Sequence, residues 1–439
     1  MPPKRTRKPE ALDTGKLRSS LDDPRVGIDV GVTLSLVRQL IGEMHRRDLR
    51  PAVKGALLLL QDCAEIASVL ALPGELEPKQ KVEYGRAIVE ARMLLGGHVA
   101  FKKGGAVLST ERLWRRSLSI LVSVAATAFA QTPGLPADDG IRIREFYRLA
   151  AQVQDKIWPN WSTVPAPLML VTKEAEFLTH HASPPKEFEK IGDDVYARPR
   201  QFPLGLLATF PAFGPPAVIV IGEPRNTESK TSTPWLITVM HEHFHQLQNG
   251  QPGYYQAVEA LGLARGDKTG MWMLNYPFPY DQPEVTQEFA RLRDLLLATV
   301  NEADSTKLTA LAKRYVAERK KFFSLVSPDD HKYFSFQLWQ EGIARYTQIK
   351  AAEAAAQYQP TPEFAALADY EPFSAYAARA RKDTLDELRQ ADLAKTRRVV
   401  VYSFGGAEGL LLDRINPKWK DEYFKELLST DRLFDSVGG

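Results

Sequence analysis

Hydrophobic positions in the second quarter of the chain predict one helix and several strands. Residues 141–156 repeat apolar side chains every three or four positions, which is the spacing of a helix with one buried face. Short apolar runs at 166–171, 194–197 and 217–221 are typical of strands. The last run is rich in β-branched residues and ends in the turn sequence Gly-Glu-Pro, so it is the clearest strand of the chain.

The second half of the chain keeps helical spacing almost throughout. The helix at 233–248 is the most sharply bounded: Ser232 or Thr233 can cap its start, and the Asn-Gly pair at 249–250 predicts a left-handed end. Further helices are expected at about 254–263, 284–300, 304–325, 334–357, 375–396, 404–414 and 418–428.

These patterns predict an α+β fold with four segments along the chain. Residues 131–232 form a mixed α+β part with a small mixed or antiparallel sheet, and residues 233–439 form a mainly helical part. Residues 111–130 have the parts of a secretory signal peptide: a basic start, an apolar stretch and a final Ala-Phe-Ala. Residues 1–110 form an N-terminal extension without a catalytic motif.

The signal-like segment leaves two interpretations open. In one, translation starts near Val107 or Leu108 at a codon other than Met, the upstream residues are not translated, and the protein is secreted or periplasmic. In the other, residues 117–130 are a buried helix of a genuine N-terminal domain, and the protein is cytoplasmic. The apolar run is shorter than the roughly 20 residues of a membrane span, so no stable span is expected.

Composition narrows the chemistry of any metal site. The 439 residues are 44% hydrophobic and 25% charged, which is ordinary for a globular protein. Cys63 is the only cysteine, which excludes a disulfide framework and a cysteine-rich zinc site, so His, Asp or Glu must hold a metal. Residues 1–116 carry 21 of the 57 basic and 14 of the 54 acidic side chains, and the remainder has a net charge of −4. No nucleic-acid partner is therefore expected.

The helix at 233–248 contains the sequence His-Glu-His-Phe-His. His241 and His245 lie four residues apart, about 40° apart around a helix, so their imidazoles can reach one ion at about 2.0–2.1 Å. Glu242 lies beside them, where it can take the proton of a zinc-bound water that attacks a peptide carbonyl and pass it to the leaving amine. His243 lies about 200° away around the helix, so we expect it to pack or hydrogen-bond on the far side.

A catalytic zinc requires three protein ligands and one open position. The positions after His245 do not continue as HExxHxxGxxH, so the third ligand must come from elsewhere. Glu341 is the favoured candidate, because it lies in an aromatic and apolar helical stretch where an unpaired carboxylate would be costly. The neighbouring Gly342 and Ala344 are small enough to let another helix approach, and Arg345 can orient the carboxylate or form a surface pair. The alternative ligands are Glu259, Glu284, Glu288 and His331.

The sequence HEHFH at 241–245, with the later Glu-Gly-x-Ala-x-Tyr at 341–346, resembles the gluzincin metallopeptidases, the thermolysin-like group. The resemblance covers residues 165–350 loosely and only these motifs closely, and the separation of the motifs is longer than in thermolysin itself. It implies a zincin-like bilobal fold, in which residues 131–232 form an upper lobe and residues 233–439 form the active-site helix and a helical lower lobe.

The same resemblance implies a zinc metallopeptidase that holds one Zn²⁺ through His241, His245 and Glu341, with Glu242 as the base. Its substrate would be a peptide or protein, bound along an edge strand at 217–221. Three residues are candidates for stabilising the oxyanion: Tyr402, Tyr346 and His331. The alternative for Tyr402 is a core aromatic residue before a Gly-Gly turn. Two other functions stay open, a catalytically silent zincin-fold binding protein and a metal-free helical scaffold.

Overall fold

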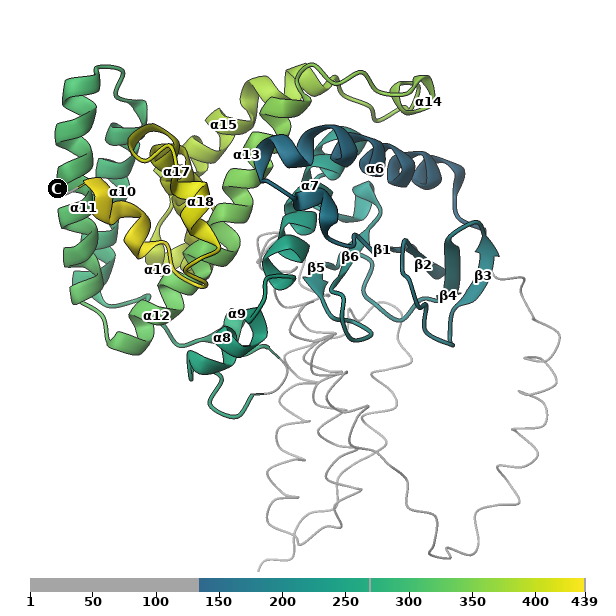
Figure 1. Ribbon diagram of the computed structural model, residues 1–439, viewed down its shortest axis with the longest axis horizontal. Coiled ribbons are helices and arrows are strands. Elements are labelled where there is room, and N and C mark those ends of the chain that lie inside the picture. The colour runs from purple at the N-terminus through teal and green to yellow at the C-terminus, as the bar shows by residue number, and fades with distance from the viewer. Residues whose placement is uncertain (1–133, 268–269, 438–439) are drawn as a thin grey trace, which may run out of the picture. The chain divides into compact units, whose positions relative to one another are not determined.

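The computed structural model describes residues 134–267 and 270–437. The expected extension at 1–110 and the expected signal peptide at 111–130 lie outside these residues. Within the described part, every strand lies before residue 223, and the chain beyond it is helical (Figure 1). The described part is therefore a mixed α+β structure with its strands and its main helices in the predicted order.

Six short strands form one mixed sheet. They are β1 Leu168–Val171, β2 Ala175–Thr179, β3 Glu189–Gly192, β4 Val195–Pro199, β5 Leu207–Phe210 and β6 Val218–Gly222. Their order across the sheet is β3-β4-β2-β1-β6-β5. The pair β1 and β6 is parallel, and the other neighbouring pairs are antiparallel. The three strands predicted from the sequence correspond to β1, β4 and β6.

The expectation that residues 217–221 form the edge of the sheet is wrong. The strand β6 lies between β1 and β5, so its main chain pairs on both sides. All five of its residues are buried, and a continuous apolar run is the pattern of an interior strand. The outer strand beside it is β5, whose four partly buried residues show no alternation that would have predicted a strand.

Two predicted helices cover the sheet: α6 (Ala137–Ile157) and α7 (Ser232–Asn249). The helix α7 packs against β5 and β6, and α6 packs against α7 (Figure 1). Ile219 and Ile221 of β6 belong to the same hydrophobic core as Met240 of α7. Because alternate strand residues point to opposite faces, α7 lies on the face to which these two isoleucines point.

The ends of α7 differ from the prediction. Its N-cap residue is Thr231, and neither Ser232 nor Thr233 caps the helix. The Ser232 hydroxyl instead donates to the carboxylate of Asp369, and the Thr233 hydroxyl donates to a main-chain carbonyl nearby in the same segment. Gly250 follows the helix with φ −77°, so the predicted left-handed cap is also wrong. The two hydroxyls therefore bond to a segment distant in sequence instead of capping the helix.

Most of the later helices were predicted, in this order, but the two short helices at 272–275 and 362–365 were not. The later helices are α8 Tyr254–Ala260, α9 Trp272–Asn275, α10 Pro283–Asn301, α11 Ser305–Ser324, α12 Pro328–Gln337, α13 Ile343–Ala355, α14 Pro362–Ala365, α15 Phe373–Gln390, α16 Leu393–Thr396, α17 Val400–Ile415 and α18 Trp419–Tyr423. The helix expected at 334–357 is divided, because a π-helical turn at Leu338–Gly342 separates α12 from α13. Such wider turns are frequent at functional sites.

The π turn lies directly against α17. A Cβ atom on Gly342 would lie 2.6 Å from Cα of Gly405, so no side chain fits between the two backbones. This confirms the close helix approach expected at Gly342. Gly405 and Gly406 lie inside α17, so the Gly-Gly turn considered after Tyr402 does not exist.

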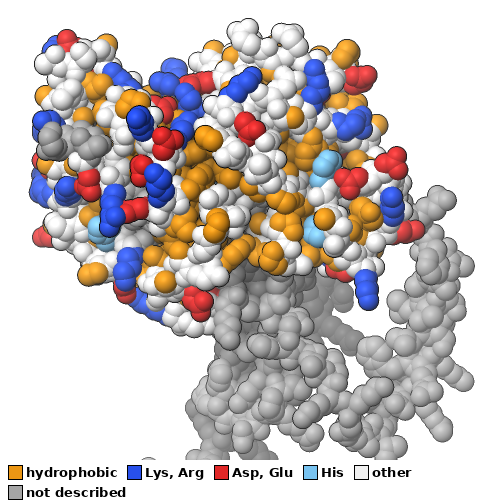
Figure 2. All heavy atoms as spheres, viewed as in Figure 1, with side chains coloured by type: hydrophobic (Ala, Val, Ile, Leu, Met, Phe, Trp, Pro, Cys, Tyr) orange, Lys and Arg blue, Asp and Glu red, His pale blue; other side chains and the backbone are white. Residues whose placement is uncertain are grey.

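The surface drawn in Figure 2 separates apolar and charged side chains. Hydrophobic side chains gather in the middle of this face, between the sheet on the right and the helices on the left. Basic and acidic side chains are mixed around them. Among the described residues, no helix combines the length and hydrophobicity needed to cross a membrane.

Candidate metal centre

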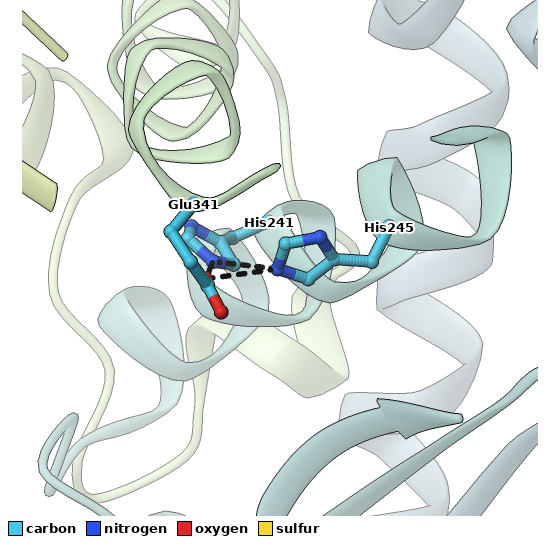
Figure 3. Close-up of side chains that lie close together, drawn as sticks. All are labelled: His241, His245 and Glu341. Atoms are coloured by element: carbon cyan, nitrogen blue, oxygen red, sulfur yellow. Dashed lines mark hydrogen bonds and ion pairs between the residues drawn. The ribbon is translucent and has the colours of Figure 1, made fainter. Parts of the chain in front are cut away.

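Three side chains from two elements converge on one point (Figure 3). His241 and His245 lie one turn apart on α7, and their Nε2 atoms are 3.2 Å apart. Glu341 of the π turn places its Oε2 atom 3.7 Å from His241 Nε2 and 3.3 Å from His245 Nε2. Within the described residues, this is the one group of three or more His, Cys, Asp or Glu side chains with ligand atoms close enough to share a metal ion.

The geometry of this cluster fits zinc. Ligands at about 2.0–2.1 Å from a tetrahedral zinc ion lie about 3.3 Å from one another. The observed separations are 3.2, 3.3 and 3.7 Å. Two imidazole nitrogens and one carboxylate oxygen are also a donor set that zinc favours. The side chain of Glu341 keeps 17% of its surface exposed, so the cluster is not sealed from solvent.

Burial and neighbouring charges shift the pKa values of the cluster residues in opposite directions. Burial lowers the pKa of His241, as expected for an imidazole out of water. Burial would also lower the pKa of His245, but the carboxylates of Glu341 and Glu242 together with the contact to Gln248 outweigh it and raise the pKa to about 9. Burial would raise the pKa of Glu341, but His245, His241 and Arg398 hold it well below its usual value. The carboxylate of Glu341 is therefore ionised and lies beside basic side chains.

Glu242 is buried on α7 and is held by the outer strand of the sheet. Thr209 of β5 places its Oγ1 atom 2.8 Å from Oε2 of Glu242 and 3.0 Å from the main-chain carbonyl of the same residue. A hydroxyl has one proton, so Thr209 donates to one of these two oxygens at a time. The contact fixes the Glu242 side chain relative to the edge of the sheet.

His243 lies on the far side of α7, as predicted. Its Nδ1 atom lies 2.9 Å from Oε1 of Gln246, its Nε2 atom lies 3.1 Å from Oε1 of Gln154, and its ring stacks on Trp161. Burial lowers its pKa to about 4, so the ring is neutral near pH 7. His243 is therefore a packing residue rather than a metal ligand.

The basic side chain beside Glu341 is Arg398, not Arg345. Arg398 is buried and places Nη1 3.6 Å from Oε1 of Glu341, the carboxylate oxygen that does not face the histidines. Arg345 lies instead 3.8 Å from a carboxylate oxygen of Glu387. The π turn adds a residue to the helical repeat, so positions four apart across it no longer share a face.

Tyr402 of α17 packs against a ligand of the cluster. Its ring stacks on that of His241 with centroids 6.2 Å apart, and Nη1 of Arg398 lies 3.4 Å from its hydroxyl. The other two oxyanion candidates bond elsewhere: Tyr346 donates to an aspartate at 2.7 Å, and His331 lies 2.9 Å from another aspartate. Of the three candidates, Tyr402 is the one that the structure brings to the cluster.

The alternative third ligands lie outside the cluster. Glu259 and Glu284 are exposed on α8 and α10. Glu288 is buried, but its carboxylate is paired with basic side chains of α10 and α11. His331 is bonded to Asp431. None of the four belongs to the group around His241 in the described part of the chain.

Sequence reasoning missed residues that contact the cluster or the neighbouring Glu242. Thr209 and Arg398 lie far from the motif in sequence, and no local pattern connects them with it. The contact of Gln248 with His245 could have been predicted, because Gln248 follows His245 by three positions and so shares its face of the helix.

Comparisons of this chain with known protein families, with curated proteins and with solved structures find no match. The resemblance to gluzincins and the zincin-like bilobal arrangement therefore stay predictions. The described structure supports the coarser description, a mixed α+β chain with a small six-stranded sheet and a helical second part.

Proposed function

We propose that this protein is a zinc-dependent peptidase in which Glu242 activates water for attack on a peptide carbonyl. The observation that carries the proposal is the convergence of His241, His245 and Glu341 at separations suited to zinc, with Glu242 on the same helix as the two histidines. When bound, zinc acidifies water and polarises a carbonyl group.

Glu242 has the surroundings of a general base. The Thr209 hydroxyl lies 2.8 Å from its Oε2 atom, and the hydrogen bond that this distance allows directs the carboxylate. The remaining lone pairs of the carboxylate can accept a proton from water as the water attacks the carbonyl carbon. The protonated Glu242 then gives this proton to the leaving amine, so the carboxylate is restored when the peptide bond is broken.

The outer strand β5 suits an extended peptide substrate. The Gly222 N–H donates to the Leu206 carbonyl, which makes this pair a hydrogen-bonded pair of the antiparallel ladder. Because such pairs alternate, Thr209 opposite Ile219 turns its main-chain N–H and C=O away from β6. A peptide added at this edge would run past the strand residue whose side chain holds Glu242.

Tyr402 is the residue that we assign to the developing oxyanion. It packs on His241, and its hydroxyl lies within reach of the Arg398 guanidinium. A donated hydrogen bond from Arg398 favours the phenolate-like polarisation of the hydroxyl and so strengthens it as a donor. Preorganised donors of this kind stabilise charge that develops in the transition state.

The test measures metal content and hydrolysis separately. Full-length protein purified without chelator is expected to hold one zinc per chain by elemental mass spectrometry. Glu242→Gln should keep the zinc and lose about 10²–10⁴-fold in hydrolysis of a peptide library. Glu341→Ala should lose the zinc. Glu259→Gln, a change on the exposed surface of α8, is the matched control and should alter neither.

The two alternative functions give different results in the same experiment. Zinc in the wild type without hydrolysis of any peptide favours a catalytically silent binding protein. A folded wild type that takes up no zinc when the metal is offered favours a metal-free helical scaffold and refutes the peptidase proposal.

A further inference from the structure

The side chain of Gln248 contacts His245 on the side away from the cluster. Gln248 lies three residues after His245 on α7 and is completely buried. Its Oε1 atom lies 2.7 Å from Nδ1 of His245, a short hydrogen bond between an amide and an imidazole. The two side chains therefore interact through the ring nitrogen that does not face Glu341.

The orientation of the Gln248 amide is set by its surroundings. Its Nε2 atom lies 2.9 Å from the carbonyl of Trp339, 3.0 Å from the carbonyl of Gln340 and 2.8 Å from the hydroxyl of Tyr423. Carbonyl oxygens only accept hydrogen bonds, so the NH₂ group must point at them. The Oε1 atom is then left for His245 and can only accept from it.

This orientation decides which nitrogen of His245 carries the proton. Because Oε1 of Gln248 accepts, Nδ1 of the ring donates and keeps its proton, and Nε2, which faces Glu341, is the nitrogen left to bind a metal ion. The Nε2 atom of Gln340 also lies 3.1 Å from the same Nδ1. When Nδ1 of His245 carries a proton, it cannot accept a hydrogen bond from the Gln340 amide N–H. The contact between Gln340 and His245 is then not a hydrogen bond in this orientation of the amide.

The same glutamine also contacts the turn that carries the third ligand. In the π turn the Ile343 N–H bonds to the Leu338 carbonyl, five residues back. The next two carbonyls, of Trp339 and Gln340, accept from Gln248. One buried side chain thus joins α7, which carries both histidines, to the π turn, which carries Glu341.

We propose that Gln248 is the positioning residue of the metal centre, which presents Nε2 of His245 as a ligand and holds the π turn of Glu341 at bonding distance from α7. The inference depends on the proposed zinc binding. Partners of this kind orient the ligand ring, and their removal typically weakens metal binding by about 10–100-fold.

The chain contains a matched control for this proposal. Gln246 follows the non-ligand His243 by three residues, and its Oε1 atom lies 2.9 Å from Nδ1 of that ring. Its Nε2 atom also lies within hydrogen-bond distance of two main-chain carbonyls, those of Pro167 and Ala217. Gln246 and Gln248 therefore have the same type of contacts, on opposite sides of the same helix, and differ in whether the histidine is a ligand.

The test compares Gln248→Met with Gln246→Met in full-length protein. Both changes remove a buried amide, so both should lower the stability of the metal-free protein. Zinc affinity, measured by competition with a chromophoric chelator, should fall about 10–100-fold in Gln248→Met and stay within about threefold of wild type in Gln246→Met. Equal affinities in both variants and the wild type would overturn the proposal, and equal losses in both variants would show general damage to α7 instead.

A third variant covers the case in which Gln248→Met does not fold. Gln248→Glu keeps an acceptor for His245 but loses the donors to the two carbonyls. We expect it to bind zinc about tenfold more weakly than wild type, because the acceptor for His245 remains while the donors that hold the π turn are lost. A fall of about 100-fold in zinc affinity, measured on the folded protein, would contradict the tautomer argument. Wild-type protein that binds no zinc refutes the proposed function itself, a result distinct from any of these.

Discussion

Replacing Gly405 with alanine tests whether the contact between α17 and the π turn supports the metal centre. The added Cβ would lie 2.5 Å from Cα of Gly342 and 3.3 Å from the carbonyl oxygen of Leu338. Two carbon atoms pack at about 3.5–4.0 Å, so the two backbones must separate by about 1 Å. Main-chain atoms lie on the facing side, so a change of rotamer there cannot relieve the contact.

The expected magnitude follows from two opposing effects. Alanine inside a helix is favoured over glycine by about 1 kcal/mol, and overpacking a core costs about 1–3 kcal/mol or more. Because the clash is between backbones, we expect the upper end of that cost and a net loss of about 2 kcal/mol. A shift of about 1 Å also exceeds the tolerance of about 0.2 Å for zinc–ligand distances, so zinc affinity should fall at least about tenfold.

Gly406→Ala is the matched control at the neighbouring position of α17. Its Cβ would meet the side chains of Arg345 and Thr384, of which the nearest is the flexible Arg345 chain at 2.9 Å. We therefore expect unchanged or higher stability in Gly406→Ala. Urea denaturation of the metal-free variants and chelator competition measure the two effects. Equal stability of the two variants, with wild-type zinc affinity in Gly405→Ala, would refute the reasoning.

Three further predictions concern Glu242 as the base, the binding of zinc, and the stability of the protein at low pH. Thr209→Val removes the hydroxyl that holds Glu242, so kcat should fall about tenfold at unchanged zinc content. Thr209→Ser keeps the hydroxyl and should keep the rate. Equal kcat values for the two variants would argue against a role of Thr209 in positioning Glu242. Zinc at 100 times its Kd stabilises the fold by about 2.7 kcal/mol, so a chelator should lower the Tm, and an unchanged Tm contradicts zinc binding. Burial raises the pKa of Asp431, but His331 and Arg319 outweigh it and hold the pKa below its usual value. A lowered folded-state pKa adds stability that is complete above the usual pKa of about 3.9 and is lost as the pH falls. In Asp431→Asn the free energy of unfolding should therefore fall less steeply below about pH 4. Urea denaturation at a series of pH values measures this, and the same fall as in wild type would refute the assignment.

Local spacing was enough to determine α7 and the orientation of its histidines. The helical period alone places His241 and His245 on one face and His243 on another, so no information beyond neighbouring turns was required. Glu341 could be identified for a second local reason, since a carboxylate within an apolar stretch is costly without a partner. Both arguments depend on a period or a burial cost that a helix keeps wherever it packs, whereas the equally local cap at Ser232 depended on a hydroxyl that found a tertiary partner.

Tertiary structure alone decided which distant groups complete the site. Hydrophobic runs predicted β6 but not its place, and strand order put β5 and its Thr209 beside Glu242. The hydroxyl of Ser232 could cap α7, yet it bonds to a segment far along the chain. A sequence pattern shows that a polar group requires a partner. Which partner it finds depends on the packing of the whole chain, because hydrogen bonds between distant segments form only where the core brings them together.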